Sequence, residues 1–251
     1  MIAKLACLSK CLKLLKLGES RLKDLNKKIN RLRVVIDMRI NDTIPDIFVK
    51  TDQGEFSLHE WIGGSWAILF SHPKDFTPVC TTEFSVVAQL KDEWANRNTK
   101  VIGISVDSVT EHEKWKRDIE FVSKCSANFP IIADADLMVS KAFDMLPAEA
   151  YLPDGRTPNN TATVRSVFII GPDKKLKLSM TYPMSVGRNF AEVVRALDAL
   201  QISSEKGVAT PANWEIGQDV IIPATVSNKD AELKFGAFNT ILPYLRKVNL
   251  G

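Results

Sequence analysis

The residues best suited to chemistry in this sequence surround one cysteine, Cys80. An apolar run predicted as a buried strand ends at Ser71, and a proline-containing loop leads from it into a predicted helix. Thr77 is a favourable N-cap and Pro78 suits the first helical position, so Cys80 falls at the third helical position. The sequence therefore predicts a sulfur atom in the first turn of a helix.

That position favours the thiolate, which is the nucleophilic form of cysteine. An ordinary thiol has a pKa of about 8.5, and the free N–H groups and positive dipole end of a helix N-terminus stabilise its anion. Arg165 lies inside the apolar run Val164–Ile170, where a charge needs a partner. Glu83, three residues after Cys80, lies on the same helix face and is placed to orient Arg165.

Each feature also has a purely structural explanation. Thr77 and Pro78 can be an ordinary helix start, Cys80 a small apolar core residue, and Arg165 a charge at a sheet edge. Their occurrence together favours nucleophilic cysteine chemistry over three independent coincidences.

Strand-like and helix-like runs alternate through residues 38–203, the segment that we expect to form the main domain. The strand-like runs are Trp66–Ser71, Lys100–Val106, Phe129–Ile132, Val164–Ile170 and Leu176–Tyr182. The helix-like runs are Cys80–Arg97, Thr110–Val122 and Asn189–Leu200. This alternation, with a hairpin turn at Gly171–Lys174, predicts an α/β sandwich with a mixed central sheet flanked by helices.

Residues 204–251 form a separate C-terminal segment in this prediction. The run Ala209–Gly217 reads as a loop, and a short strand at Asp219–Ile222 and a weak helix follow it. About fifty residues with few apolar positions are too few to fold alone. We therefore expect a small α+β segment that packs on the main domain or on a partner subunit.

Residues 1–37 form a basic amphipathic extension, with ten lysines and arginines against three acidic residues. Leucines and isoleucines recur at helical spacing, interrupted at Gly18. The segment could be a targeting presequence, a membrane-surface or coiled-coil helix, or an extension upstream of a natural start at Met38. Mitochondrial presequences are rich in arginine and poor in acid, whereas this one is lysine-rich and contains Glu19 and Asp24. We therefore expect a cytoplasmic protein, with mitochondrial import as the alternative.

The overall composition excludes several functional classes. The net charge is +3, but the basic excess lies in residues 1–37 and the remaining chain is mildly acidic, which argues against nucleic-acid binding. No apolar run approaches the roughly 18 residues of a membrane span, so we expect no integral membrane association. Four cysteines are too few to staple a chain of this size and fit a reducing compartment. His59, His72 and His112 form no ligand cluster, so we expect no metal or other cofactor.

The pattern Pro73-x-x-x-Thr77-x-x-Cys80 resembles the active-site motif of the peroxiredoxins, and the run from Ser71 to Glu83 resembles their one-cysteine, peroxiredoxin VI type. The resemblance extends from about residue 39 to the C-terminus through Val106-Asp107-Ser108, Phe129-Pro130-Ile131-Ile132, Arg165, Gly171–Leu178, Gly187-Arg188-Asn189-Phe190 and Ala209–Trp214. It implies a thioredoxin-like fold and a thiol-dependent peroxidase that acts on hydrogen peroxide and organic hydroperoxides.

The resemblance also implies a role for each site residue. The cysteine matching Cys80 attacks the peroxide and becomes a sulfenic acid, and the threonine matching Thr77 hydrogen-bonds the thiolate and the peroxide. The proline matching Pro73 shields the site from water, and the arginine matching Arg165 stabilises the thiolate and polarises the O–O bond. Glu83 supports Arg165.

Two further positions are expected to support the site, His72 beside the motif proline and Arg188 in the Gly187–Phe190 run. No cysteine follows Cys125 in the sequence, and Cys125 itself is expected to be a bystander. The sulfenic acid therefore needs an external thiol or another reductant. By the same resemblance the C-terminal segment is a dimerising extension, so a homodimer or higher homo-oligomer is expected.

Two other activities have partial counterparts in the sequence. Some members of the one-cysteine subfamily have a phospholipase A2-like activity assigned to a serine, a histidine and an aspartate, which match Ser65, His59 and Asp173. Here Gly63-Gly64-Ser65-Trp66-Ala67 lacks the last glycine of G-x-S-x-G, and the serine precedes a strand. A thiol–disulfide oxidoreductase needs C-x-x-C, but residue 77 is a threonine. Both alternatives are disfavoured.

Overall fold

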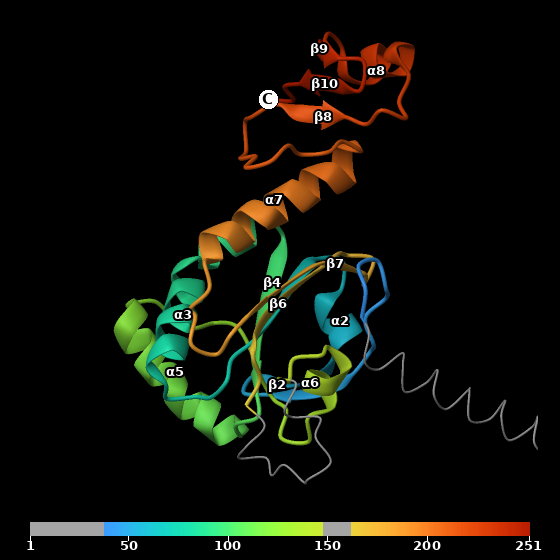
Figure 1. Ribbon diagram of the computed structural model, residues 1–251. Coiled ribbons are helices and arrows are strands. Elements are labelled where there is room, and N and C mark those ends of the chain that lie inside the picture. Colours follow the sequence, from blue (N-terminus) through green and yellow to red (C-terminus); the bar gives the residue numbers. More distant parts are fainter. Residues whose placement is uncertain (1–37, 148–161) are drawn as a thin grey trace, which may run out of the picture.

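The computed structural model describes residues 38–147 and 162–251, and these residues form a main sheet with helices on both faces (Figure 1). The sheet has seven strands in the order β2-β1-β5-β4-β3-β6-β7. The strands are β1 (Phe48–Thr51), β2 (Gly54–Ser57), β3 (Trp66–Ser71), β4 (Thr99–Ser105), β5 (Ile131–Ala133), β6 (Arg165–Ile170) and β7 (Leu176–Tyr182). The pairs β3–β4 and β4–β5 are parallel and the others antiparallel, so the predicted mixed sheet is confirmed.

Six helices accompany this sheet in the described part of the chain, and they cover its two faces. They are α2 (Leu58–Ile62), α3 (Pro78–Gln89), α4 (Lys91–Asn96), α5 (Val109–Ser123), α6 (Met138–Ala142) and α7 (Phe190–Lys206). Successive residues of β3 point to opposite faces. Ile68 and Phe70 join the apolar cluster under α3, α5 and α7, whereas Ala67 and Leu69 join the cluster under α2 and α6.

The predicted helix Cys80–Arg97 was wrong as a single element, because the structure divides it at Leu90. The backbone of Leu90 has ψ of 14°, outside the helical range. The indole N–H of Trp94 donates to the carbonyl of Val87 at 3.1 Å. In an unbroken helix that carbonyl would accept from the N–H of Lys91, so the Trp94 side chain takes over a backbone partner.

The C-terminal segment forms a small unit beyond the end of α7 (Figure 1). Its elements are β8 (Val220–Ile222), α8 (Asn228–Phe235), β9 (Asn239–Leu242) and β10 (Leu245–Val248), with the sheet order β8-β10-β9. A separate small core contains Trp214, Val220 and Ala231, and Ala199 and Ile202 of α7 pack against it. The predicted α+β character is confirmed, and the unit packs on α7.

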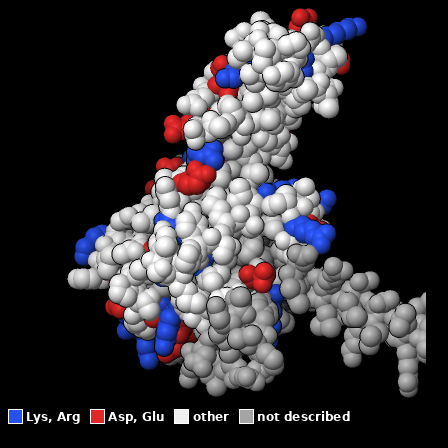
Figure 2. Space-filling model, in the orientation of Figure 1, with Lys and Arg blue, Asp and Glu red and all other residues white. Residues whose placement is uncertain are grey.

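On the face shown in Figure 2, basic and acidic side chains are interspersed and neither sign forms a large patch. Within the described residues, no helix combines the length and apolar character that a membrane crossing needs. The predicted amphipathic helix of residues 1–37 lies outside the described residues.

One packing contact in the apolar cluster under α3, α5 and α7 is tight enough to test. A Cβ added at Gly103 of β4 would lie 2.9 Å from two ring carbons of the buried Phe84. We expect Gly103→Ala to lower the free energy of unfolding by about 1–3 kcal/mol, because an overpacked core forces strained side chains. Urea denaturation measures this change.

Gly64→Ala is the matched control, because a Cβ at Gly64 meets no atom within 4 Å. We expect it to change the free energy of unfolding by less than about 0.5 kcal/mol. Equal denaturation midpoints for the two variants would contradict the packing argument.

Candidate active site

The loop between β3 and α3 carries the predicted site residues. Thr77 has the extended backbone of an N-cap, with φ of −115° and ψ of 147°, and α3 begins at Pro78. Cys80 is therefore the third helical residue, as predicted. The side chain of Thr77 makes no capping hydrogen bond and instead donates to the carbonyl of Lys74 at 2.9 Å. Thr77 is therefore the N-cap residue, as predicted, and its hydroxyl closes the preceding loop.

The sulfur of Cys80 faces Arg165. The Nη1 atom of Arg165 lies 3.2 Å from Sγ, and the cysteine has no solvent-exposed surface. The same Nη1 donates to Oε2 of Glu83 at 2.7 Å, and Nε donates to the carbonyl of Met184 at 2.8 Å. The guanidinium is therefore held in place by other groups while one of its nitrogens meets the sulfur.

Glu83 also binds Arg188, the residue just before the N-cap of α7. Nε and Nη2 of Arg188 donate to the two carboxylate oxygens at 2.9 and 2.7 Å, and the backbone N–H of Arg188 donates to Oε1 at 2.8 Å. Nη1 of Arg188 reaches the carbonyls of Ser71 and Ser166, at the ends of β3 and β6. Arg188 thus ties the acidic residue of the site to both strands.

The charged side chains around the sulfur have a positive sum. Burial would raise the pKa of Glu83, but hydrogen bonds and positive charge from Arg188, with the charge of Arg165, hold it below the ordinary 4.5. Two guanidinium groups and one carboxylate leave one positive charge in excess in a buried site. A thiolate at Cys80 neutralises that excess.

Comparison with known proteins places this geometry in a family. The AhpC/TSA family model matches residues 40–179, and the model of the C-terminal domain of 1-Cys peroxiredoxin matches residues 199–236. The chain belongs to the 1-Cys peroxiredoxins. Peroxiredoxins of this type are thiol-dependent peroxidases, so the predicted family, fold and enzyme class are confirmed.

Individual relatives cover most of this 1-Cys peroxiredoxin. It is 50% identical over 212 residues to mitochondrial peroxiredoxin PRX1 of Saccharomyces cerevisiae, covering 83% of this chain and 80% of the relative. It is 43% identical over 216 residues to peroxiredoxin-6 of Gallus gallus, covering 83% and 94%. A solved structure of a yeast mitochondrial 1-Cys peroxiredoxin matches with a TM-score of 0.77 at 47% identity, covering 85% and 100%.

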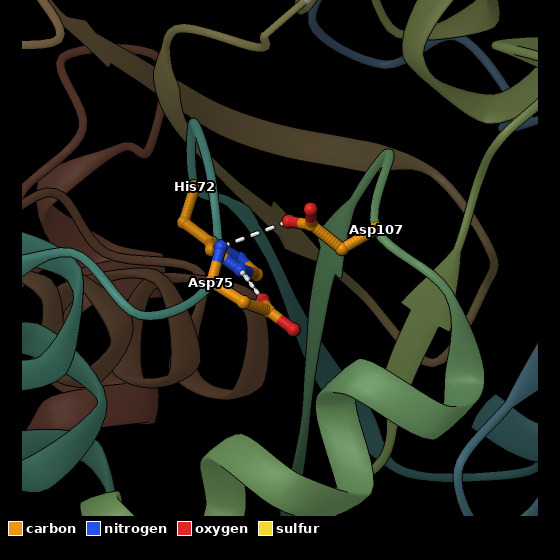
Figure 3. A group of neighbouring side chains, drawn as sticks. All are labelled: His72, Asp75 and Asp107. Atoms are coloured by element: carbon orange, nitrogen blue, oxygen red, sulfur yellow. Dashed lines mark hydrogen bonds and ion pairs between the residues drawn. The ribbon is translucent and has the colours of Figure 1, made fainter. Parts of the chain in front are cut away.

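His72 and Pro73 of this peroxiredoxin lie in the loop between β3 and α3. Pro73 is partly buried in the loop before Thr77. His72 hydrogen-bonds Asp75 at 2.7 Å, in a buried group that also contains Asp107 (Figure 3). The sequence analysis did not predict this group. The signal was present, because His72 and Asp75 follow β3 and Asp107 follows β4, and the carboxyl ends of these adjacent parallel strands lie at one edge of the sheet.

The three residues considered for a hydrolase do not form a catalytic triad in this structure. Ser65 Oγ donates to Asn98 at 3.0 Å, and His59 Nε2 bonds the carbonyl of Ile44 at 2.9 Å. Asp173 pairs with Lys177 at 2.7 Å. Since each polar group is engaged elsewhere, the geometry does not support hydrolysis at this position.

The buried Glu83 generates a prediction about acid stability. We expect Glu83→Gln to lower the free energy of unfolding by about 3 kcal/mol near neutral pH, because two buried guanidinium groups lose their counter-charge. The pKa of Glu83 is lowered in the folded protein, so its contribution is complete above the ordinary value of 4.5 and disappears as the pH falls through the folded value. Urea denaturation of both proteins across this range should show the difference shrinking toward acid.

Glu93→Gln is the control, because Glu93 is half exposed in its ion pair with Arg97. We expect that change to cost less than about 1 kcal/mol at any pH. A Glu83→Gln penalty that stayed constant from neutral to acid would show that the charge of Glu83 does not stabilise the fold.

Proposed function

We propose that Cys80 is the peroxidatic residue and that it reduces hydrogen peroxide and organic hydroperoxides. The observation that carries this proposal is the 3.2 Å approach of Arg165 Nη1 to a buried sulfur in the first turn of α3. Such a guanidinium stabilises both the attacking thiolate and the negative charge that develops on the leaving oxygen. Thr77 and Pro73 belong to the same proposal as the residues that line the approach to the sulfur.

The reaction is a displacement at oxygen. The thiolate attacks one peroxide oxygen, an S–O bond forms and the O–O bond breaks. The leaving oxygen carries away the electron pair and takes a proton, which gives water from hydrogen peroxide or an alcohol from an organic hydroperoxide. Cys80 is left as a sulfenic acid, two electrons more oxidised than the thiol.

Regeneration by an external thiol completes the proposed cycle. Cys125, the other cysteine among the described residues, is partly buried behind α5, and its carbonyl and N–H both bond Ser123. No cysteine follows it in the chain. An external thiolate would attack the sulfenic sulfur, form a mixed disulfide and release water, and a second thiol would then restore Cys80. The solved yeast relative is described as resolved through glutathione and thioredoxin systems, and we extend that class of reductant to this chain.

We also infer that the C-terminal unit joins two copies of the chain. It matches the C-terminal domain of 1-Cys peroxiredoxins, and its described surface exposes Leu233, Ile241 and Tyr244. Apolar surface of this kind is typical of a contact with another protein.

For the cellular compartment we propose the cytoplasm, with the mitochondrion as the alternative suggested by the yeast relative. Mass spectrometry of the native N-terminus would separate a cleaved presequence from a retained one.

Cysteine substitution tests the nucleophile. We expect Cys80→Ser to abolish peroxide consumption measured by stopped flow, because a serine hydroxyl does not ionise near neutral pH. Cys125→Ser, the matched control, should keep the rate constant of the wild type within about twofold. Peroxide consumption by Cys80→Ser at the wild-type rate would refute the proposal.

Substitution of the arginine tests the electrostatic role. We expect Arg165→Lys to lower kcat/KM for hydrogen peroxide by about 100-fold. The planar guanidinium contacts Glu83, the Met184 carbonyl and the sulfur at the same time, and the single ammonium nitrogen of lysine cannot reproduce that geometry. Arg195→Lys is the control, since Arg195 pairs with Glu192 near the surface of α7. If both variants kept the wild-type kcat/KM, Arg165 would have no part in the reaction.

A further inference from the structure

Four buried polar residues beside the active-site loop form a continuous hydrogen-bonded group, which we call the His–Asp cluster: His72, Asp75, Asp107 and His112. Oδ1 of Asp75 lies 2.7 Å from Nε2 of His72, and Oδ2 lies 2.6 Å from Nδ1 of His112. The backbone N–H of Asp75 donates to Oδ2 of Asp107 at 2.8 Å. Figure 3 shows His72 and Asp107 approaching Asp75 from different elements. Asp75 is therefore held on three sides.

The hydrogen-bond partners determine where the protons lie. Nε2 of His112 faces the carbonyl of Ile132 at 3.2 Å, and a carbonyl can only accept. Burial would raise the pKa of Asp75, but the hydrogen bonds from His112 and His72 outweigh it and lower that pKa, so the carboxylate is ionised. Nδ1 of His112 lies 2.6 Å from this carboxylate, so His112 bridges Asp75 and the backbone of β5. Burial is the largest influence on His72 and lowers its pKa. Asp75 and Asp107 raise that pKa and His112 lowers it, but the net direction is downward. His72 is therefore neutral and donates from Nε2.

The residue after Asp75 has a strained backbone. Phe76 has a φ of 55°, in the left-handed region that a bulky residue avoids, and its side chain is 52% exposed. Because Phe76 is so exposed, the packing of its side chain does little to offset the cost of the positive φ. The strain is therefore imposed by its neighbours, with Asp75 fixed in the His–Asp cluster on one side and Thr77 fixed as the N-cap of α3 on the other.

A second contact links the His–Asp cluster to the helix of the reactive cysteine. The ring of Trp115 in α5 stacks on His72 with centroids 4.9 Å apart. Its indole N–H donates to Oγ1 of Thr81 at 3.0 Å, and Thr81 is the residue next to Cys80. The first turn of α3 is thus held both through the loop and through α5.

The geometry fits a clamp, in which hydrogen bonds hold Asp75 in place, better than a cation site. His72, Asp75 and Asp107 each offer a ligand atom within 4.8 Å of the others. However, both oxygens of Asp75 already lie at hydrogen-bond distance from imidazole nitrogens, and Oδ2 of Asp107 accepts from Asp75 and from Ser105. Protons occupy the positions that a cation would need.

We propose that Asp75 is a positioning residue for the peroxidase reaction: clamped by His72, His112 and Asp107, it fixes the strained loop that sets Cys80 against Arg165. The proposal rests on the proposed role of Cys80. It predicts that loosening the clamp moves the sulfur away from the guanidinium while the rest of the fold persists.

Asp75→Asn tests the clamp, because an amide cannot accept from both imidazoles. We expect kcat/KM for hydrogen peroxide to fall about 10- to 100-fold, as for a catalytic group displaced by about 1 Å. The ultraviolet titration of the Cys80 thiolate should shift toward higher pH.

Asp134→Asn is the matched control. Asp134 is an equally buried aspartate, and its oxygens accept the N–H groups of Val139 and Ser140 in α6. Val139 belongs to the apolar cluster under α2 and α6, whereas Cys80 belongs to the other cluster. We expect it to keep kcat/KM and the thiolate titration within about twofold. Equal losses in both variants would overturn the proposal in favour of a general stability effect.

Two further substitutions keep the test decisive if Asp75→Asn folds poorly. His112→Asn retains an N–H donor toward Asp75 and should keep kcat/KM within about fivefold, whereas His112→Leu removes the donor and should lose as much as Asp75→Asn. Phe76→Gly relieves the positive φ, since glycine adopts it without strain, so Asp75→Asn should cost less in that background.

The outcomes separate this proposal from the proposed function. An inactive Cys80→Ser together with a fully active Asp75→Asn would refute the clamp alone. Peroxide consumption by Cys80→Ser would refute the role of Cys80. A stoichiometric metal ion in the purified wild type that is lost in Asp75→Asn would replace the clamp with a cation site.

Discussion

The carboxylate of Glu83 between two buried guanidinium groups is the interaction on which this structure depends. The side chains of Glu83, Arg165 and Arg188 are 3%, 4% and 0% exposed. Taking such charges out of water is costly unless they are paired and fully hydrogen-bonded. One carboxylate cannot balance two guanidinium groups, and Nη1 of Arg165 also lies 3.2 Å from the sulfur of Cys80. The sulfur of Cys80 therefore lies beside a buried group of charges whose sum is positive.

The ion pairs among Glu83, Arg165 and Arg188 connect the secondary structure to the active site. Cys80 and Glu83 come from one turn of α3, and Arg165 is the first residue of β6. Arg188 binds the carbonyls of Ser71 and Ser166 as well as Glu83, and so connects the ends of two neighbouring strands to the helix. Removing one of these charges disturbs packing and chemistry together, because the same hydrogen bonds serve both.

Much of this arrangement follows from local sequence patterns. The apolar run Trp66–Ser71 gave β3 and the alternating run Leu176–Tyr182 gave β7, both with the predicted bounds, and the Thr77–Pro78 pair located the start of α3. The spacing of Cys80 and Glu83, with a charge inside an apolar strand, was enough to bring Arg165 into the site. These predictions worked because each depends on residues close together in the chain or on the burial of a long strand.

Other features depend on contacts that no local pattern records. Strands β1 and β2 are four residues each with few buried positions, and every residue of β9 is exposed, so none has a clear apolar period. The hydroxyl of Thr77 could bond either the helix or the loop, and only the folded backbone decides. Asp75 and His112 are 37 residues apart, and their meeting depends on how α5 packs beside the loop.

The absence of any exposed surface on Cys80 has a consequence for the catalytic cycle. A peroxide is only a few atoms long, whereas a thiol reductant carries a peptide or a whole protein. On the proposed role of Cys80, a reductant larger than a peroxide needs more room around the buried sulfur than the oxidant does. The same burial that sets Cys80 against Arg165 therefore makes the size of the reductant a constraint on the recovery of the thiol.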